Sequence, residues 1–334
     1  MAPPTNQSYT VGWICALPSE MAAARAMLDQ DHGRPREQDR SDSNTYRLGR
    51  IAEHNVVLAC LPAGVYGLAS AATVAAQMLS TFKSIRFGLL VGVGGGVPGE
   101  GTDIRLGDVV VSKPKDTSGG VRQYDYGKTV AEGRFTFTGS LNKPPQVLLT
   151  AVANLEADHM MEESKISKFL TEMAVKYPNM GPEFGHPGSQ HDRLYEAQYD
   201  HAASHNTCES CDSRRLKSRP ARSRAIPAIH YGLIASGNQV MRHGGTRDRL
   251  RDQLDVLCFE MEAAGLMDNF PCLVIRGICD YADSHKNDRW QKYAAATAAA
   301  YAKELLCIIP RNEVAGTPTA SQVTALSPDG TYTF

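Results

Sequence analysis

Residues 87–96 read FGLLVGVGGG, an apolar run that passes directly into glycines. Apolar runs without alternation are typical of parallel strands that are covered on both faces. Glycines at the carboxyl end of such a strand allow a ligand to approach the backbone, although a tight turn with positive φ would use them equally well. The segment is not a Walker loop, because no Gly-Lys-Ser/Thr follows, and it is not a GxGxxG fingerprint, because Pro98 and Gly99 stand where a helix should begin.

Similar apolar runs lie on both sides of this segment, separated by stretches with helical periodicity. The predicted strands are residues 11–17, 56–61, 87–93, 109–112, 231–236 and 273–279. The predicted helices are residues 19–28, 68–82, 145–156, 246–253 and 289–309. This alternation predicts an α/β fold with a central mixed, mostly parallel sheet flanked by helices.

Two segments depart from the alternation, and they define the expected domain organisation. We predict one domain over residues 8–311. Residues 179–228 are polar and rich in His, Arg, Ser and Pro, which indicates an insertion into that domain. Residues 312–334 have a Thr, Ser, Pro and Gly composition without periodicity, which predicts a disordered tail.

The composition narrows the possible partners and the cellular location. Thirty-five basic against 36 acidic residues give a formal charge of −1, so the chain has no global basic field to hold nucleic acid. No apolar run reaches the ~20 residues of a membrane helix, and the N-terminus lacks a signal-peptide pattern. Most of the eight cysteines stand in apolar runs, which is typical of core residues in a reducing compartment. We expect a cytoplasmic protein without membrane or nucleic-acid partners.

Carboxylates stand at the ends of three predicted strands. Glu20 heads the first helix, where it serves either as a surface acid that stabilises the helix dipole or as a base at the mouth of the sheet. Glu260 and Glu262 share a face if their strand persists, whereas an earlier turn points one into the mouth and the other away. Asp280 closes an apolar strand and suits proton donation; the alternative is a helix N-cap, which Asp283 fits better.

One possible metal motif lies inside the insertion. His201, His205, Cys208 and Cys211 have a spacing that a closed zinc site can use. Only one CxxC pair is present and its surroundings are polar, so a surface loop with unpaired thiols is the favoured interpretation. At the site formed by the strand-end carboxylates we expect no metal and no other cofactor.

Together these sheet-end motifs resemble the nucleoside phosphorylase/nucleosidase superfamily. Within it, the chain resembles 5′-methylthioadenosine/S-adenosylhomocysteine nucleosidases and fungal purine (ATP) nucleosidase-like domains. The resemblance covers residues 9–112 and 230–308. It is carried by ICAL (14–17) before Glu20, the glycine segment, LGDVVVS (106–112), GLIASGN (232–238), Met261-Glu262 and RGICDYAD (276–283).

The resemblance implies roles by position. Glu20 positions and deprotonates the attacking water, Glu262 binds ribose hydroxyls and stabilises the cationic sugar, and Asp280 protonates the purine N7. The other implied substrate contacts in the sheet are Val93, Gly94, Gly95, Asn238, Val240, Met241, Phe259 and Met261. Asn238 replaces the aspartate usual in the family and so lacks its charge. These roles match the chemistry, because cleavage of an N-glycosidic bond needs an anion near the sugar, a proton donor at the base and an aligned nucleophile.

Water, rather than phosphate, is the expected nucleophile. Phosphorylases of this superfamily hold phosphate with Arg and Ser or Thr, where this chain has Leu90 and Val93. Apolar side chains do not bind a dianion, and Glu20 would repel it. Arg25 remains as an alternative phosphate ligand.

Cationic residues near the predicted 5′ end of the ribose favour a phosphorylated substrate, although a solvated surface is the other interpretation. They are Arg122 and Lys128 in the loop 119–128, followed by Arg242, His243 and Arg247. The resemblance implies hydrolysis of ATP to adenine and ribose triphosphate by a homodimer, because that loop reaches a neighbouring subunit in relatives. The alternatives are a phosphate-dependent purine nucleoside phosphorylase and a non-catalytic module that senses adenine nucleotides.

Overall fold

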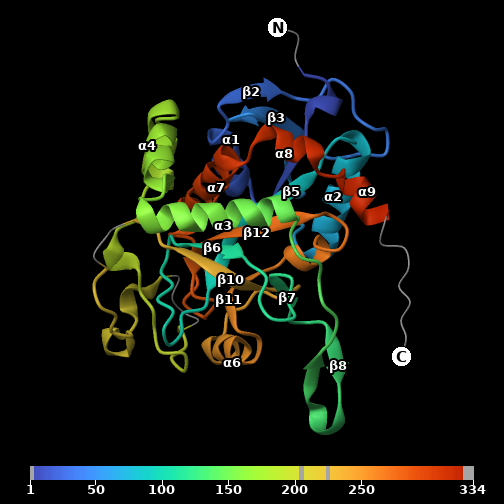
Figure 1. The fold of residues 1–334 in the computed structure, drawn as a ribbon. Helices are drawn as coiled ribbons and strands as arrows, with labels where there is room; N and C mark the ends of the chain where they lie inside the picture. The colour runs from blue at the N-terminus through green and yellow to red at the C-terminus, as the bar shows by residue number, and fades with distance from the viewer. Residues whose placement is uncertain (1–3, 203–206, 223–225, 326–334) are drawn as a thin grey trace.

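The computed structural model describes residues 4–202, 207–222 and 226–325 (Figure 1). Its strands are β1 (Val11–Cys15), β2 (Gln30–Gly33), β3 (Tyr46–Ile51), β4 (His54–Cys60), β5 (Phe87–Gly96), β6 (Val109–Ser112), β7 (Val121–Gln123), β8 (Gly127–Thr129), β9 (Phe135–Phe137), β10 (Ile229–Ser236), β11 (Val256–Glu260) and β12 (Cys272–Asp280). Its α-helices are α1 (Pro18–Ala26), α2 (Leu68–Thr81), α3 (Gln146–Met161), α4 (Ile166–Lys176), α5 (Met180–Phe184), α6 (Gly244–Leu254), α7 (Gln291–Ile308), α8 (Arg311–Gly316) and α9 (Ala320–Ala325).

The described strands, apart from the β8–β9 hairpin, form one sheet in the order β11-β10-β6-β12-β5-β1-β4-β3-β2, with β7 paired to β10. The pairs β1–β5 and β5–β12 are parallel, whereas β6–β12 and β3–β4 are antiparallel. Helices α1, α3, α4 and α7 cover one face of the sheet, and α2 packs against the other. The predicted α/β fold with a mixed, mostly parallel sheet is therefore confirmed.

Strand β5 continues through all the glycines, so the interpretation as a tight turn is wrong. None of residues 92–96 has a positive φ. A Cβ at Gly92 would lie 2.5 Å from Glu20 Oε1, and a Cβ at Gly95 would lie 2.8 Å from Asp280 Oδ1. Gly92 and Gly95 are needed because carboxylates from neighbouring elements occupy the space of their missing side chains.

The end of β5 also pairs with β11 in the antiparallel sense, through Gly95–Phe259 and Gly96–Cys258. This extra pairing closes β11, β10, β6, β12 and β5 into a ring of strands. The carboxyl ends of β5, β11 and β12 are thereby held around one point.

The expected disordered tail is wrong for residues 312–325, most of which form α8 and α9. Val314 and Ala320 are buried, and the Ala320 N–H donates to the Ile85 carbonyl at 2.8 Å. Each of these helices has only six residues, too few to show a periodic pattern in the sequence. Residues 326–334 lie outside the described part of the chain. Among the described helices, none has the length and apolar character of a membrane span.

Candidate active site

A cavity of about 240 Å³ opens at the ends of β5, β11 and β12. Glu20, Glu262 and Asp280 all line it, and all three are at least 95% buried. They come from the first turn of α1, the turn after β11 and the last residue of β12. The three predicted carboxylates therefore meet in one buried space.

Glu20 is fixed by backbone donors on two elements. Its Oε2 accepts hydrogen bonds from the N–H groups of Ala16 at 2.7 Å and Leu17 at 3.0 Å, and its Oε1 accepts from Val93 N–H at 2.8 Å. Burial raises the pKa of Glu20 above its usual range, although Arg276 and these donors oppose the shift. A carboxylate offers about four lone-pair positions, so roughly one remains for a further donor such as water.

Arg276 is a buried cation in the middle of the acidic cluster. Its Nη2 forms a close ion pair with Glu260 and lies 3.2 Å from Glu262 Oε2. Burial opposes the charge, yet the surrounding carboxylates hold the pKa of Arg276 above its ordinary value. Glu260 also accepts hydrogen bonds from the N–H groups of Glu262 and Ala263, at 3.1 and 3.0 Å. Glu260 thus fixes the turn that presents Glu262 to the cavity.

The negative charge of Glu262 is less strongly balanced by its neighbours than that of Glu260. Burial, with repulsion from Glu260 and Glu20, raises the pKa of Glu262 to about 7 in spite of Arg276. The turn after β11 therefore directs both acids toward one arginine, so neither of the two geometries considered from the sequence holds in full. Near neutral pH, Glu262 exchanges between its charged and neutral forms.

Asp280 is paired with a lysine that lies six residues further along the chain. Its Oδ2 forms a close ion pair with Lys286 Nζ and lies 3.1 Å from the Cys279 thiol. Its Oδ1 accepts from the Ala282 N–H at 2.8 Å. Asp280 raises the pKa of Lys286 above its ordinary value, although burial alone would lower it. The ion pair therefore keeps Lys286 protonated beside the Asp280 carboxylate.

Most of the other predicted contacts line the same cavity. These are Val93, Gly94, Gly95, Val240, Met241, Phe259 and Met261. Asn238 stands just outside the lining, where its Oδ1 accepts from Leu68 N–H at 3.2 Å and so caps α2. Four carboxylates and two cations border the cavity, which makes it acidic.

None of the predicted phosphate-binding cations is among the residues that line this cavity in the described chain. Arg242 is exposed directly after Met241, and Lys128 lies on the exposed β8–β9 hairpin, which projects from the body (Figure 1). Arg122 lies on β7, which pairs with β10. Tyr124, in the same predicted loop 119–128, packs edge-on against Phe259 with ring centroids 5.4 Å apart. This loop therefore packs against a residue of the cavity lining.

Other cations considered from the sequence are used by the fold. Arg247 is fully buried and donates to the Tyr281 carbonyl at 2.9 Å, and His243 caps α6 by accepting from Thr246 N–H. Arg25 is exposed and lies 4.0 Å from Asp31. Arg276 and Lys286 are charged partners of the site that were not predicted from the sequence. An arginine inside an apolar strand was the available signal, because such a side chain must find a buried anion.

Comparisons with known proteins agree with this architecture. A model of the phosphorylase superfamily matches residues 10–308. A nucleotide-binding leucine-rich repeat (NLR)-like protein from Hyaloscypha variabilis is 46% identical over 91% of this chain. The chain spans only 30% of the length of that relative. An ATP nucleosidase, Cap17, from Escherichia coli is 37% identical over 77 residues, which are 21% of this chain and 15% of Cap17.

Among solved structures, a 5′-methylthioadenosine/S-adenosylhomocysteine nucleosidase from Neisseria meningitidis, in complex with methylthio-immucillin-A, has a TM-score of 0.56 at 19% identity. The match covers 89% of this chain and 98% of the other, which supports the same fold. With the family model covering nearly the whole described sheet, the chain belongs to the phosphorylase superfamily.

Proposed function

We propose that this protein is a purine N-glycosidase that hydrolyses adenine nucleosides or nucleotides. One observation carries the proposal: Glu20, Glu262 and Asp280 converge on a single buried cavity. Departure of the base leaves positive charge on the sugar and negative charge on the purine. A site of this kind stabilises both charges and holds the nucleophile.

The proposed reaction breaks the C1′–N9 bond and forms a C1′–O bond to water. Asp280 passes a proton from its ion-pair partner Lys286 to N7, so adenine leaves as a neutral molecule. Glu20 uses its remaining lone pair to hold the water and accepts a proton from it. Glu262, as an anion, lies beside the ribose and stabilises the cationic sugar. Proton transfer through solvent then carries the proton taken by Glu20 back to Lys286, and both groups return to their starting states.

The charge of the cavity favours water over phosphate. Four carboxylates against two cations would repel a dianion, and Glu20 already takes the Val93 N–H, a donor next to the glycine segment. Arg276 does not compensate, because Glu260 and Glu262 engage it. Water carries no such penalty.

We propose ATP as the preferred substrate, with its triphosphate outside the acidic cavity. Arg122, Lys128 and Arg242 all stand outside the lining, and Arg242 directly follows a lining residue. Lys128 is on the β8–β9 hairpin, whose exposed Tyr126 and Phe135 suit a contact with the partner in a homodimer. The similarity to the ATP nucleosidase Cap17 over 77 residues adds support.

Purified protein mixed with ATP is expected to release adenine at the same rate with and without inorganic phosphate, as measured by chromatography. Arg242→Ala should raise KM for ATP more than for adenosine, because it removes a cation that only the triphosphate meets. Arg249→Ala, an exposed cation on α6, is the matched control and should change neither. Cleavage of adenosine with ATP untouched would reject the triphosphate assignment. Strict phosphate dependence would indicate a phosphorylase, and tight binding without any product would indicate a sensing module.

The pH profile should report the raised pKa of Glu262. Because the sugar cation needs the charged form, kcat/KM is expected to fall as pH drops below about 7, well above the range of an ordinary carboxyl. Glu260→Gln removes a charge that repels Glu262, and Arg276 then pairs with Glu262 alone. The pKa of Glu262 should fall, so the loss of kcat/KM on the acid side of the profile should move to lower pH. An acid limb unchanged in Glu260→Gln would contradict the role given to Glu262.

A further inference from the structure

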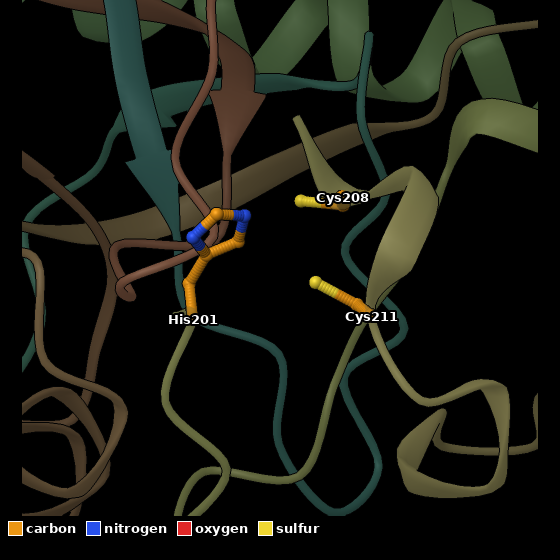
Figure 2. A group of neighbouring side chains, drawn as sticks. All are labelled: His201, Cys208 and Cys211. Atoms are coloured by element: carbon orange, nitrogen blue, oxygen red, sulfur yellow. The ribbon is translucent and has the colours of Figure 1, made fainter. Parts of the chain in front are cut away.

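Three zinc-type ligands meet in the insertion, outside the cavity described above. The Nδ1 or Nε2 of His201 and the Sγ atoms of Cys208 and Cys211 all lie within 4.8 Å of one another. Figure 2 shows the ring of His201 and both thiols facing a common space, from two separate stretches of chain. Tetrahedral zinc, with bonds of about 2.3 Å to sulfur, places two sulfurs about 3.8 Å apart, so a small contraction completes the geometry.

A second observation at the same place is a buried histidine whose ring makes no hydrogen bond, although its Nδ1 lies 3.7 Å from Asp283 Oδ1. His285 is 6% exposed, and neither of its ring nitrogens has a hydrogen-bond partner among the described residues. Its ring stacks on Tyr195 with centroids 4.1 Å apart and stands edge-on to His201 at 5.4 Å. Buried ring nitrogens normally find a partner, and a metal ion satisfies this need.

The cluster is attached to the segment that follows Asp280. The His201 N–H donates to Ser284 Oγ at 2.9 Å, and the Cys208 thiol lies 3.6 Å from the His285 carbonyl. This segment leads directly to Lys286, the ion-pair partner of Asp280. Anything that fixes the cluster also fixes the backbone that carries this lysine.

We propose that His201, Cys208 and Cys211 bind a structural Zn²⁺ that fastens the insertion to the turn between Asp280 and Lys286. His285 lies beside these three ligands but outside the 4.8 Å that joins them, so it becomes the fourth ligand by moving toward the ion. His205, the fourth residue of the sequence motif, lies outside the described residues. The site is closed and structural, in contrast to catalytic zinc sites that keep a position for water. It does not depend on the proposed nucleosidase activity.

Metal analysis of the full chain, purified without chelators under reducing conditions, tests the proposal. We expect about one zinc per chain, in keeping with a four-ligand structural site. Cys208→Ser and Cys211→Ser should lose the metal, whereas Cys307→Ser, an exposed thiol elsewhere, should keep it. Cobalt substitution should give a thiolate-to-metal absorption band in the wild type and none in Cys208→Ser.

Chelation should lower the Tm of the wild type by several degrees and leave that of Cys208→Ser unchanged. His285→Phe, which keeps the stacking on Tyr195, should bind zinc more weakly; wild-type affinity in this variant would overturn the assignment of the fourth ligand. Metal-free wild-type protein that gives no cobalt–thiolate band, or a Cys208–Cys211 disulfide in the reduced preparation, would overturn the zinc site. These readouts stay informative even if the variants fold poorly, because the first measurements use the wild-type chain.

Discussion

Asp280→Asn is expected to lower kcat for adenine release by about 10²–10⁴-fold, the usual contribution of a general acid. Asparagine keeps the shape of the side chain and an acceptor for the Ala282 N–H, but it cannot take up a proton from Lys286 and pass it to N7. The measurement is single-turnover release of adenine from the proposed substrates. A wild-type rate would refute the assignment of Asp280 as proton donor.

This substitution also leaves Lys286 without its counter-ion, so a loss of stability must be separated from a loss of chemistry. Lys286 is largely buried, and a buried ammonium without a partner destabilises the fold. The double variant Asp280→Asn/Lys286→Met removes both charges, so we expect its Tm to recover while its activity does not. A riboside with p-nitrophenol as leaving group gives a second test. The p-nitrophenolate group leaves without protonation, so Asp280→Asn should cleave this riboside at nearly the wild-type rate.

Glu20→Gln should produce a loss of similar size for every substrate, including the p-nitrophenyl riboside. The attack of water needs a base whichever group departs, and an amide is not a base. The variant should also lose about 1–3 kcal/mol of stability, because its NH₂ group faces backbone N–H donors that the carboxylate now accepts.

Glu304→Gln is the matched control for this loss of stability. Glu304 is equally buried, accepts from the Lys165 N–H at 2.8 Å, and is absent from the cavity lining. Its substitution should reduce the free energy of unfolding without changing kcat. If Glu20→Gln and Glu304→Gln reduced activity equally, Glu20 would have no role as a base.

The sequence was most informative where burial on both faces leaves a continuous apolar pattern. All nine residues of β12 are buried, and its predicted span is nearly correct. Strand β3 was missed because Arg47 and Arg50 interrupt its apolar positions, and β2 is a mostly polar edge strand. Such strands are specified by pairing across the sheet, which a local pattern does not contain.

The acids of the site were predictable because they stand at strand ends, where parallel strands of a sheet place their side chains together. Their cationic partners were not. Arg276 and Glu260 are 16 residues apart on different strands, so their pairing depends on the strand order. Arg247 shows the converse, because its sequence position suggested a phosphate contact but the fold buries it against Tyr281.

The contact between α7 and β12 has a consequence for how substrates are accommodated. At Gly277 the helix backbone lies so near that a Cβ would fall 1.8 Å from the Ala294 carbonyl oxygen. Helix and strand are therefore packed backbone against backbone at this point, which leaves little room for the segment from Arg276 to Asp280 to shift. The cavity lining also includes Tyr66 and Val240, which are 54% and 45% exposed. With the proposed nucleoside in the cavity, we therefore expect different 5′ groups to be accommodated by these exposed side chains rather than by the packed segment that carries Asp280.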